Sequence, residues 1–264
     1  ENSKPIGVFD SGVGGLSILV ELQKLLPKEN FVFLADQKYL PYGDKNKKEL
    51  VHRCSVITDY FIKKHDIKML VIACNTATAN TVDALRKKYS FPIVGTIPAI
   101  KPASENTKSK TISVLSTSST SRSSALKNLI KEYCGGMNVF NVGCKDLVNT
   151  VETGDLSSPK VQILLEKYLE TTKNSSADYL VLGCTHYPFL RKTIQKIVGS
   201  RVKLIDSGQA IAKRTKALVL KNNFKKSGIK KGKIGYFTTG NASKFSKVAS
   251  KLLQVEIQAK KVEI

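Results

Sequence analysis

The sequence predicts an α/β protein made of two similar domains, each with a parallel sheet, and three observations support this. Short apolar runs that suit buried strands alternate with longer stretches of helical spacing. The run 69–74 (MLVIAC) has no polar position, which is typical of a strand covered on both faces. The strand and helix pattern of the first hundred residues then recurs along the chain, which indicates a duplicated architecture.

The first half of the chain predicts strands and helices in strict alternation, and this order favours a parallel sheet. Apolar side chains in the first helix recur at helical spacing until Pro27 closes it. The first strand runs into a glycine-rich turn. The predicted strands are 6–12, 30–36, 69–74 and 92–97, and the predicted helices are 16–26, 47–65 and 76–89.

The second half repeats this order. The later stretches 111–126, 137–143 and 177–187 match 5–19, 29–36 and 67–77 in pattern rather than in identity. Residues 204–223 (a strand end and a helix), the strand 234–240 and a final amphipathic helix belong to neither repeat, and we expect them to pack on the first half. The sequence thus predicts one domain from 1–97 with 208–264 and another from 98–207, with crossovers near 97–110 and 205–210.

Composition limits the possible partners. The 264 residues carry a formal charge of +22, which favours polyanions without specificity. The chain has no tryptophan, no nucleic-acid-binding motif and no aromatic residues interleaved with its basic runs. We therefore expect solvated basic faces, compatible with attraction of an anionic small substrate. Nucleic-acid binding is the alternative from a different functional class.

The apolar runs and the cysteines indicate the cellular compartment that we expect for this protein. No run approaches the roughly 18 apolar residues that span a bilayer, and residues 1–10 lack the pattern of a signal peptide. The five cysteines are odd in number and form no C-x-x-C pair, which disfavours a disulfide framework and a structural zinc site. We expect a cytoplasmic protein with reduced thiols, no membrane association and no metal.

Small polar clusters follow the predicted strands in both halves. In parallel α/β sheets, ligands bind outside the carboxyl ends of strands. If the halves face each other about a pseudo-twofold axis, Cys74 and Cys184 lie on opposite walls of one cleft. The clusters are Asp10-Ser11, Pro41-Tyr42-Gly43, Cys74-Asn75-Thr76, Thr117 to Thr120, Glu152 and Cys184-Thr185-His186.

Two opposed thiols suit the inversion of a stereocentre beside a carboxylate, because one group removes a proton and the other returns one to the opposite face. A thiol with a pKa of about 8.5 is only roughly 3% ionised at pH 7. A nearby histidine or helix N-terminus raises that fraction. Each cysteine precedes residues that predict a helix start, and the candidate partners are Asp10 for Cys74 and His186 for Cys184. No lysine lies in these clusters, so we expect no pyridoxal cofactor.

Each candidate also has a structural interpretation. Cys184 alone is as well explained as a buried core thiol, and only its pairing with Cys74 favours chemistry. Cys54, Cys134 and Cys144 lack such flanking residues and are expected to be structural. Asp10 is also a candidate helix cap and Glu152 a candidate exposed turn carboxylate. Residues 12–15 (GVGG) lack the spacing of a phosphate loop and instead predict a tight turn near a substrate carboxylate.

The ordered stretches together resemble the bacterial glutamate racemases of the cofactor-independent aspartate/glutamate racemase superfamily. The resemblance covers about 5–210 and implies racemisation of glutamate without a cofactor, as a supply of D-glutamate for peptidoglycan. An aspartate racemase or related isomerase of the same superfamily is the alternative, although Asn75 and the second Cys-Thr-His motif favour glutamate. The matching stretches are 7–17 (GVFDSGVGGLS), 41–43 (PYG), 73–77 (ACNTA), 95–103 (GTIPAIKPA), 151–154 (VETG) and 182–188 (LGCTHYP).

The resemblance also implies individual roles. Cys74 would act on the α-proton of D-glutamate and Cys184 on that of L-glutamate, with Asp10, Glu152 and His186 as supporting residues. Ser119 stands where the family's threonine turn has a glycine before Thr120. Family members form homodimers, and 95–103 resembles the form found in members activated by a cell-wall precursor. The implied substrate contacts are Asp10, Ser11, Pro41, Tyr42, Gly43, Asn75, Thr76, Thr117, Thr120, Thr185 and His186.

Overall fold

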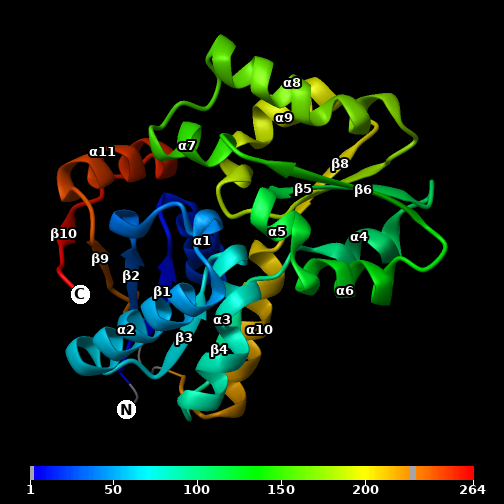
Figure 1. Cartoon of the computed structure of the whole chain (residues 1–264). Coiled ribbons are helices and arrows are strands. Elements are labelled where there is room, and N and C mark those ends of the chain that lie inside the picture. The colour runs from blue at the N-terminus through cyan, green and yellow to red at the C-terminus, as the bar shows by residue number, and fades with distance from the viewer. Residues whose placement is uncertain (1–2, 226–229) are drawn as a thin grey trace. The chain divides into compact units, whose positions relative to one another are not determined.

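The computed structural model describes residues 3–225 and 230–264, and its strands form two sheets (Figure 1). Within these residues, one sheet has the order β10-β9-β2-β1-β3-β4 and the other the order β6-β5-β7-β8. The described strand pairs are parallel, which confirms the predicted α/β class. The strands are β1 (Ile6–Asp10), β2 (Phe31–Ala35), β3 (Met69–Ile72), β4 (Ile93–Gly95), β5 (Thr111–Thr117), β6 (Asn138–Cys144), β7 (Tyr179–Leu182), β8 (Lys203–Asp206), β9 (Ile234–Thr238) and β10 (Ala259–Lys261).

Helices connect successive strands. The α-helices are α1 (Leu16–Leu25), α2 (Lys47–His65), α3 (Asn75–Lys88), α4 (Ile100–Asn106), α5 (Ser118–Arg122), α6 (Ser124–Tyr133), α7 (Leu147–Glu152), α8 (Pro159–Asn174), α9 (Arg191–Val198), α10 (Gly208–Lys221) and α11 (Ala242–Leu253). The 3-10 helices are η1 (Val13–Gly15), η2 (Gln37–Tyr39), η3 (Tyr42–Asp44) and η4 (Tyr187–Leu190).

The contacts divide the chain into two compact units. The first comprises Glu1–Thr96 and Gly208–Ile264, and the second comprises Ile97–Ser207. The first unit holds the larger sheet because β9 of the C-terminal segment pairs with β2. The second unit holds the smaller sheet.

Helices cover both faces of the sheet in the first unit. Right-handed crossovers place α1 on one face and α2 with α3 on the other, because the chain changes direction after β2. Consistently, α2 packs against α3 and α1 against α10. Strand β3 is therefore buried along its whole length, as its unbroken apolar run predicted.

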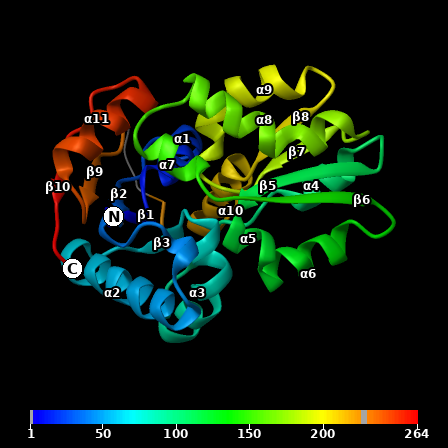
Figure 2. The ribbon, with the colours of Figure 1, turned by 45° about the horizontal axis from the view of Figure 1, so that its top comes forward.

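The second unit repeats the strand order of the first. Its order β6-β5-β7-β8 matches β2-β1-β3-β4, so the predicted repeat is present in the topology. Helices α8 and α9 pack together on one face and α4 with α6 on the other (Figure 2). In both units the strand order reverses at the central strands. Ligands of open α/β sheets bind outside the carboxyl ends of the strands at such a reversal.

Local sequence signals explain where helix α2 begins and ends. Helix α2 begins after Asn46, whose side chain accepts from the Glu49 N–H while the Glu49 carboxylate accepts from Asn46 N–H. Lys63 and Lys64 lie in its last turn, where positive charge is favourable because the C-terminal end of a helix carries partial negative charge. The observed bounds are those predicted.

Two differences from the predicted elements matter. Strand β3 ends at Ile72 rather than at residue 74, so Cys74 lies outside the ladder and begins a helix instead. Strand β10 was not predicted, because it is short and two of its three residues are lysines. Such charged, short strands are typical of sheet edges.

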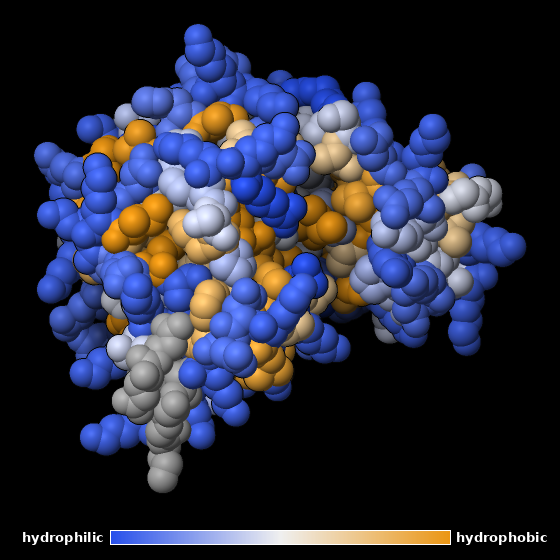
Figure 3. Space-filling model, turned by 90° about the horizontal axis from the view of Figure 1, so that it is seen from below, coloured by the Kyte–Doolittle hydropathy of each residue, from blue (hydrophilic) through white to orange (hydrophobic). Residues whose placement is uncertain are grey.

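Charged side chains lie at the surface of the molecule. Hydrophilic residues cover much of the face in Figure 3, with hydrophobic residues gathered between them. Lys244, Lys247 and Lys251, for example, are exposed along α11. In the two described ranges, no helix combines the length and apolar character needed to cross a bilayer.

Candidate active site

The site residues of the first unit gather at the carboxyl ends of β1 and β3. Phe9 pairs with Ile72, so Asp10 and Cys74 leave their strands at the same edge. The Ser11 N–H and hydroxyl both donate to Asp10 Oδ1, at 2.6 and 3.2 Å. The Ser11 oxygen also lies 3.9 Å from Cys74 Sγ. Asp10 and Cys74 are thus connected through Ser11.

Cys74 occupies the N-terminal position of a long helix. It is the N-cap of α3, and its Sγ accepts from the Ala77 N–H at 3.5 Å. A helix N-terminus carries partial positive charge and favours the thiolate. The residue is only 6% exposed. The predicted helix start after this cysteine is therefore present and contacts the sulfur.

The residues that follow Cys74 are buried and polar. Asn75 and Thr76 are each 5% exposed. In the described part of the chain, Asn75 Oδ1 has no hydrogen-bond partner. Buried polar atoms without partners are rare in folded proteins, so this carbonyl is suited to receiving a ligand donor.

The predicted stretch 41–43 contains one hydroxyl, and a protein side chain holds it. The Tyr42 hydroxyl donates to Asp36 Oδ2 at 2.6 Å, and its ring is buried. Burial, with Cys54 and Asp36 nearby, raises the pKa of Tyr42 well above its ordinary value. This phenol therefore remains a donor to Asp36. Pro41 is exposed and Gly43 is half-buried.

The site residues of the second unit are centred on Cys184, which follows β7. His186 Nδ1 lies 3.7 Å from Cys184 Sγ, and His186 Nε2 lies 2.6 Å from Glu152 Oε1. Glu152 ends α7 and is not an exposed turn residue, since its side chain is only 9% exposed. The three residues form a thiol–imidazole–carboxylate series.

The charge state of His186 follows from these neighbours. Burial by itself lowers the pKa of His186, but hydrogen bonds with Cys184 and Glu152 outweigh it and raise the pKa well above the usual value. An imidazolium beside a thiol stabilises the thiolate. The arrangement suits Cys184 to accept a proton.

Thr117 and Thr120 lie at the carboxyl end of β5. Leu115 pairs with Leu182, so Thr117, the last residue of β5, lies at the same edge as Cys184, which follows β7. The Thr117 hydroxyl donates to Thr120 Oγ1 at 3.0 Å, and the Thr120 N–H donates to Thr117 Oγ1 at 3.2 Å. Ser119 is accommodated in this turn, and Thr120 is buried.

The structure differs from some expectations at this edge. No α-helix begins directly after Cys184: the 3-10 helix η4 starts at Tyr187, and it has no side-chain cap. Thr185 is buried in the intervening turn. The N-cap positions of η1 and α1 are Gly12 and Gly15 rather than Asp10. Gly15 approaches Asp10 closely, since a Cβ at Gly15 would lie 2.6 Å from Asp10 Cβ.

The remaining cysteines are buried thiols. Burial raises the pKa of Cys54 and of Cys144 to about 12, and it also raises that of Cys134. Within the described residues, no group of histidines, cysteines and carboxylates is placed to hold a metal ion.

Sequence reasoning missed Asp36 and Arg53. Asp36 is fully buried directly after β2, and Arg53 Nη2 lies 2.6 Å from its Oδ1. The signal was present, because Asp36 follows a strand just as Cys74 does, but its arginine partner is distant in sequence.

Comparison with known proteins identifies the chain's relatives. The family model described as Asp/Glu/Hydantoin racemase matches residues 21–215. The glutamate racemase of Pseudomonas syringae pv. tomato is 40% identical over 252 residues, which are 95% of this chain and 91% of the relative.

Solved structures agree. The glutamate racemase isoform RacE1 of Bacillus anthracis has a TM-score of 0.89 at 30% identity, covering 100% of this chain and 99% of that one. The Escherichia coli glutamate racemase, solved with L-glutamate and the activator UDP-MurNAc-ala, has a TM-score of 0.83 at 30% identity, with 94% and 95% covered. The chain belongs to the Asp/Glu/hydantoin racemase family, within which it is an isomerase with glutamate racemase activity.

Proposed function

We propose that this chain interconverts L- and D-glutamate by direct proton transfer between the α-carbon and two thiols, Cys74 and Cys184. The proposal requires both thiols to reach one α-carbon from opposite faces. One thiolate removes the α-proton, and the other thiol donates its proton to the resulting carbanion. The two sulfurs exchange protonation states in each turnover, so no external oxidant or reductant is needed.

One observation carries this proposal: each thiol follows a central strand and has its own polar neighbours. Cys74 has the Ala77 N–H and the Ser11 hydroxyl, whereas Cys184 has His186 backed by Glu152. General acid–base catalysis is most effective when the pKa of the acting group lies near the working pH. A helix N-terminal N–H at Cys74 and an imidazole at Cys184 are groups of the kind that stabilise a thiolate.

The proposed direction follows the family resemblance. For L-glutamate, Cys184 removes the proton and Cys74 returns one to the other face; D-glutamate uses the reverse order. His186 stabilises the Cys184 thiolate, and Glu152 holds the imidazole in place. Asp10 holds Ser11, whose hydroxyl faces the Cys74 sulfur.

The surrounding polar groups suit the two ends of an amino acid. Asn75 Oδ1 is an acceptor for the substrate ammonium group, since it has no partner in the described residues. Hydroxyl and backbone N–H groups of Ser11, Thr76, Thr117, Thr120 and Thr185, with the backbone at Pro41–Gly43, would hold the carboxylates.

The test is racemisation without added cofactor. Cys74→Ser and Cys184→Ser should each abolish turnover, whereas Cys134→Ser, a matched buried cysteine, should remain active. In D2O the wild-type enzyme should place deuterium at the α-carbon. Racemisation by either folded serine variant at the wild-type rate would refute the assignment.

We further propose that the chain forms a homodimer, supplies D-glutamate for cell-wall synthesis and responds to a cell-wall precursor. Support for activation comes from 95–103 and from the E. coli relative, which was solved with UDP-MurNAc-ala. Adding that compound to the assay should raise turnover; an unchanged rate at saturating activator would exclude activation. Sedimentation measurements test the dimer.

A further inference from the structure

Asp36 is the centre of a buried hydrogen-bond network in the first unit. Its Oδ2 accepts from Arg53 Nε at 2.9 Å and from the Tyr42 hydroxyl at 2.6 Å. Its Oδ1 accepts from Arg53 Nη2 at 2.6 Å and from the Thr239 hydroxyl at 2.9 Å. The arginine contact is bidentate, the strongest geometry for such a pair.

Tyr42 links this network to the proposed substrate contacts. Asp36 holds the Tyr42 hydroxyl, and Tyr42 is the first residue of η3. This short helix packs against α3, the helix whose N-cap is Cys74. The anchored side chain therefore fixes the backbone at 41–43, which is proposed to contact glutamate.

Arg53 is itself held on several sides. Its Nη1 donates to the Ile264 carbonyl at 2.6 Å, and its guanidinium stacks 3.9 Å from the centre of the Tyr39 ring. The planar, forked guanidinium makes these contacts together, which a lysine ammonium does not reproduce.

We infer that Arg53 is a positioning residue for the racemase reaction: it orients Asp36, which holds Tyr42 and so sets the backbone that binds glutamate. The inference rests on the proposed function, because it takes Pro41–Gly43 as a substrate contact. Arg53 itself acts through Asp36, to which it donates two hydrogen bonds.

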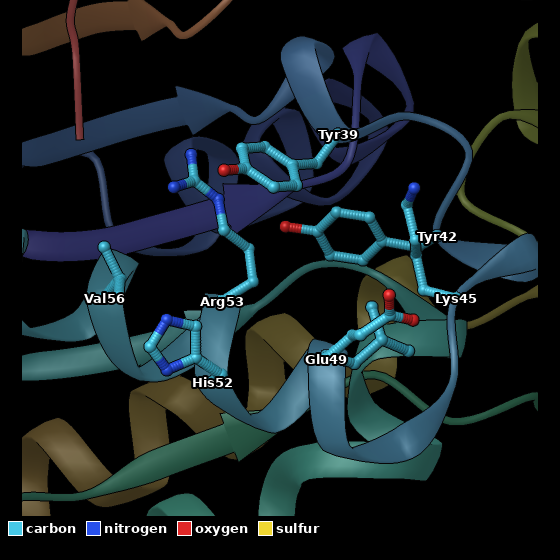
Figure 4. Close-up of a pocket in the computed structure, with 8 residues that line it drawn as sticks. Tyr39, Tyr42, Lys45, Glu49, His52, Arg53 and Val56 are labelled. Carbon is cyan, nitrogen blue, oxygen red and sulfur yellow. The ribbon is translucent and has the colours of Figure 1, made fainter.

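A pocket beside Arg53 makes this inference testable by chemical rescue. It has a volume of about 190 Å³, and Arg53, Tyr39 and Tyr42 line it with Lys45, Glu49, Leu50, His52 and Val56 (Figure 4). Truncating Arg53 enlarges a pocket that is already present. A guanidinium ion has the shape and charge of the group removed.

The same unit offers a matched control. Lys68 and Glu29 form another buried ion pair, with Nζ and Oε2 2.5 Å apart. These residues precede β3 and β2, so the pair lies at the amino ends of strands whose carboxyl ends carry the site. Lys68 also donates to the Phe224 carbonyl. Breaking this pair destabilises the unit without touching Asp36 or Tyr42.

The experiment compares Arg53→Ala with Lys68→Ala in the full chain, measuring kcat and KM for both glutamate enantiomers. Arg53→Ala should raise both KM values roughly tenfold with a smaller change in kcat, because it weakens ground-state and transition-state binding alike. Guanidinium at low millimolar concentration should lower KM again, whereas urea should not. Lys68→Ala should lose stability but keep its KM and show no rescue.

An unchanged KM in folded Arg53→Ala, or an equal rise in Lys68→Ala, would overturn the inference. Tyr42→Phe covers the case in which Arg53→Ala does not fold: it removes only the hydroxyl and should also raise KM, and an unchanged KM there refutes the network's role. Failure of the proposed function has another signature, namely racemisation by Cys74→Ser or Cys184→Ser.

Discussion

His186 joins Cys184 to Glu152 through its two ring nitrogens, with Nε2 2.6 Å from the carboxylate and Nδ1 3.7 Å from the sulfur. A carboxylate only accepts, so Nε2 carries hydrogen and Nδ1 faces the thiol. Cys74 accepts from the Ala77 N–H at the start of α3. The two thiols are thus adjusted by different means, and this difference leads to the predictions below.

Glu152→Gln should shift the pH dependence of Cys184 alkylation. The carboxylate helps raise the pKa of His186, so its loss lowers that pKa and the imidazolium disappears at lower pH. The Cys184 thiolate then loses a neighbouring positive charge, and its reaction with iodoacetamide at pH 7 should slow roughly tenfold. Peptide mass spectrometry measures the rate. Glu166→Gln, at an exposed carboxylate in the same unit, should leave it unchanged; an identical profile for Glu152→Gln contradicts the prediction.

His186→Asn should make proton removal from L-glutamate the slow step. The kcat/KM values for the enantiomers must fall together, because the equilibrium constant of a racemisation is one. Kinetic isotope effects are free to differ: the effect on kcat/KM with α-deuterated L-glutamate should rise above that with α-deuterated D-glutamate. Loss of an acid–base partner should reduce kcat/KM by roughly a hundredfold. Equal isotope effects from both enantiomers would rule out a specific role of His186 at Cys184.

Cys54 and Cys144 should resist alkylation in the folded enzyme. Burial raises the pKa of each to about 12. At pH 8, each of these thiols is therefore ionised in roughly one molecule in ten thousand. Cys74 and Cys184 should be modified first, and their modification should account for the loss of activity. Mass spectrometry after partial inactivation shows which thiols react. Faster labelling of Cys144 than of Cys184 would be inconsistent with these environments.

Gly15→Ala should reduce both stability and activity. Its new Cβ would lie 2.6 Å from Asp10 Cβ and 3.2 Å from Ala73 Cβ, so the turn must move away from the Cys74 edge. Overpacking of this kind costs about 1–3 kcal/mol. Urea unfolding and the racemase assay measure both effects. Gly135→Ala, where an added Cβ meets no atom within 4 Å, is the control, and equal behaviour of the two variants would count against the close approach.

The two cysteines show how far sequence reasoning reaches into the site. Each follows an apolar run, and parallel strands end at one edge of a sheet, so sequence alone predicts both thiols as candidates. Their neighbours differ in predictability. His186 is two residues from Cys184 in sequence, whereas Glu152 reaches His186 from the end of α7. Ser11, which was predicted only as a substrate contact, also lies against the Cys74 sulfur, and the Asp10 carboxylate accepts from its N–H and hydroxyl.

The sequence by itself determined the α/β class, the repeated strand order and the family, because hydrophobic periodicity and motif spacing are local properties of a chain. Tertiary structure alone decided which side chains share a proton or a charge. The Arg53–Asp36 pair and the His186–Glu152 pair join residues far apart in sequence. Hydrogen bonds of this kind depend on distances of a few tenths of an ångström, and only the packing of strands and helices sets such distances.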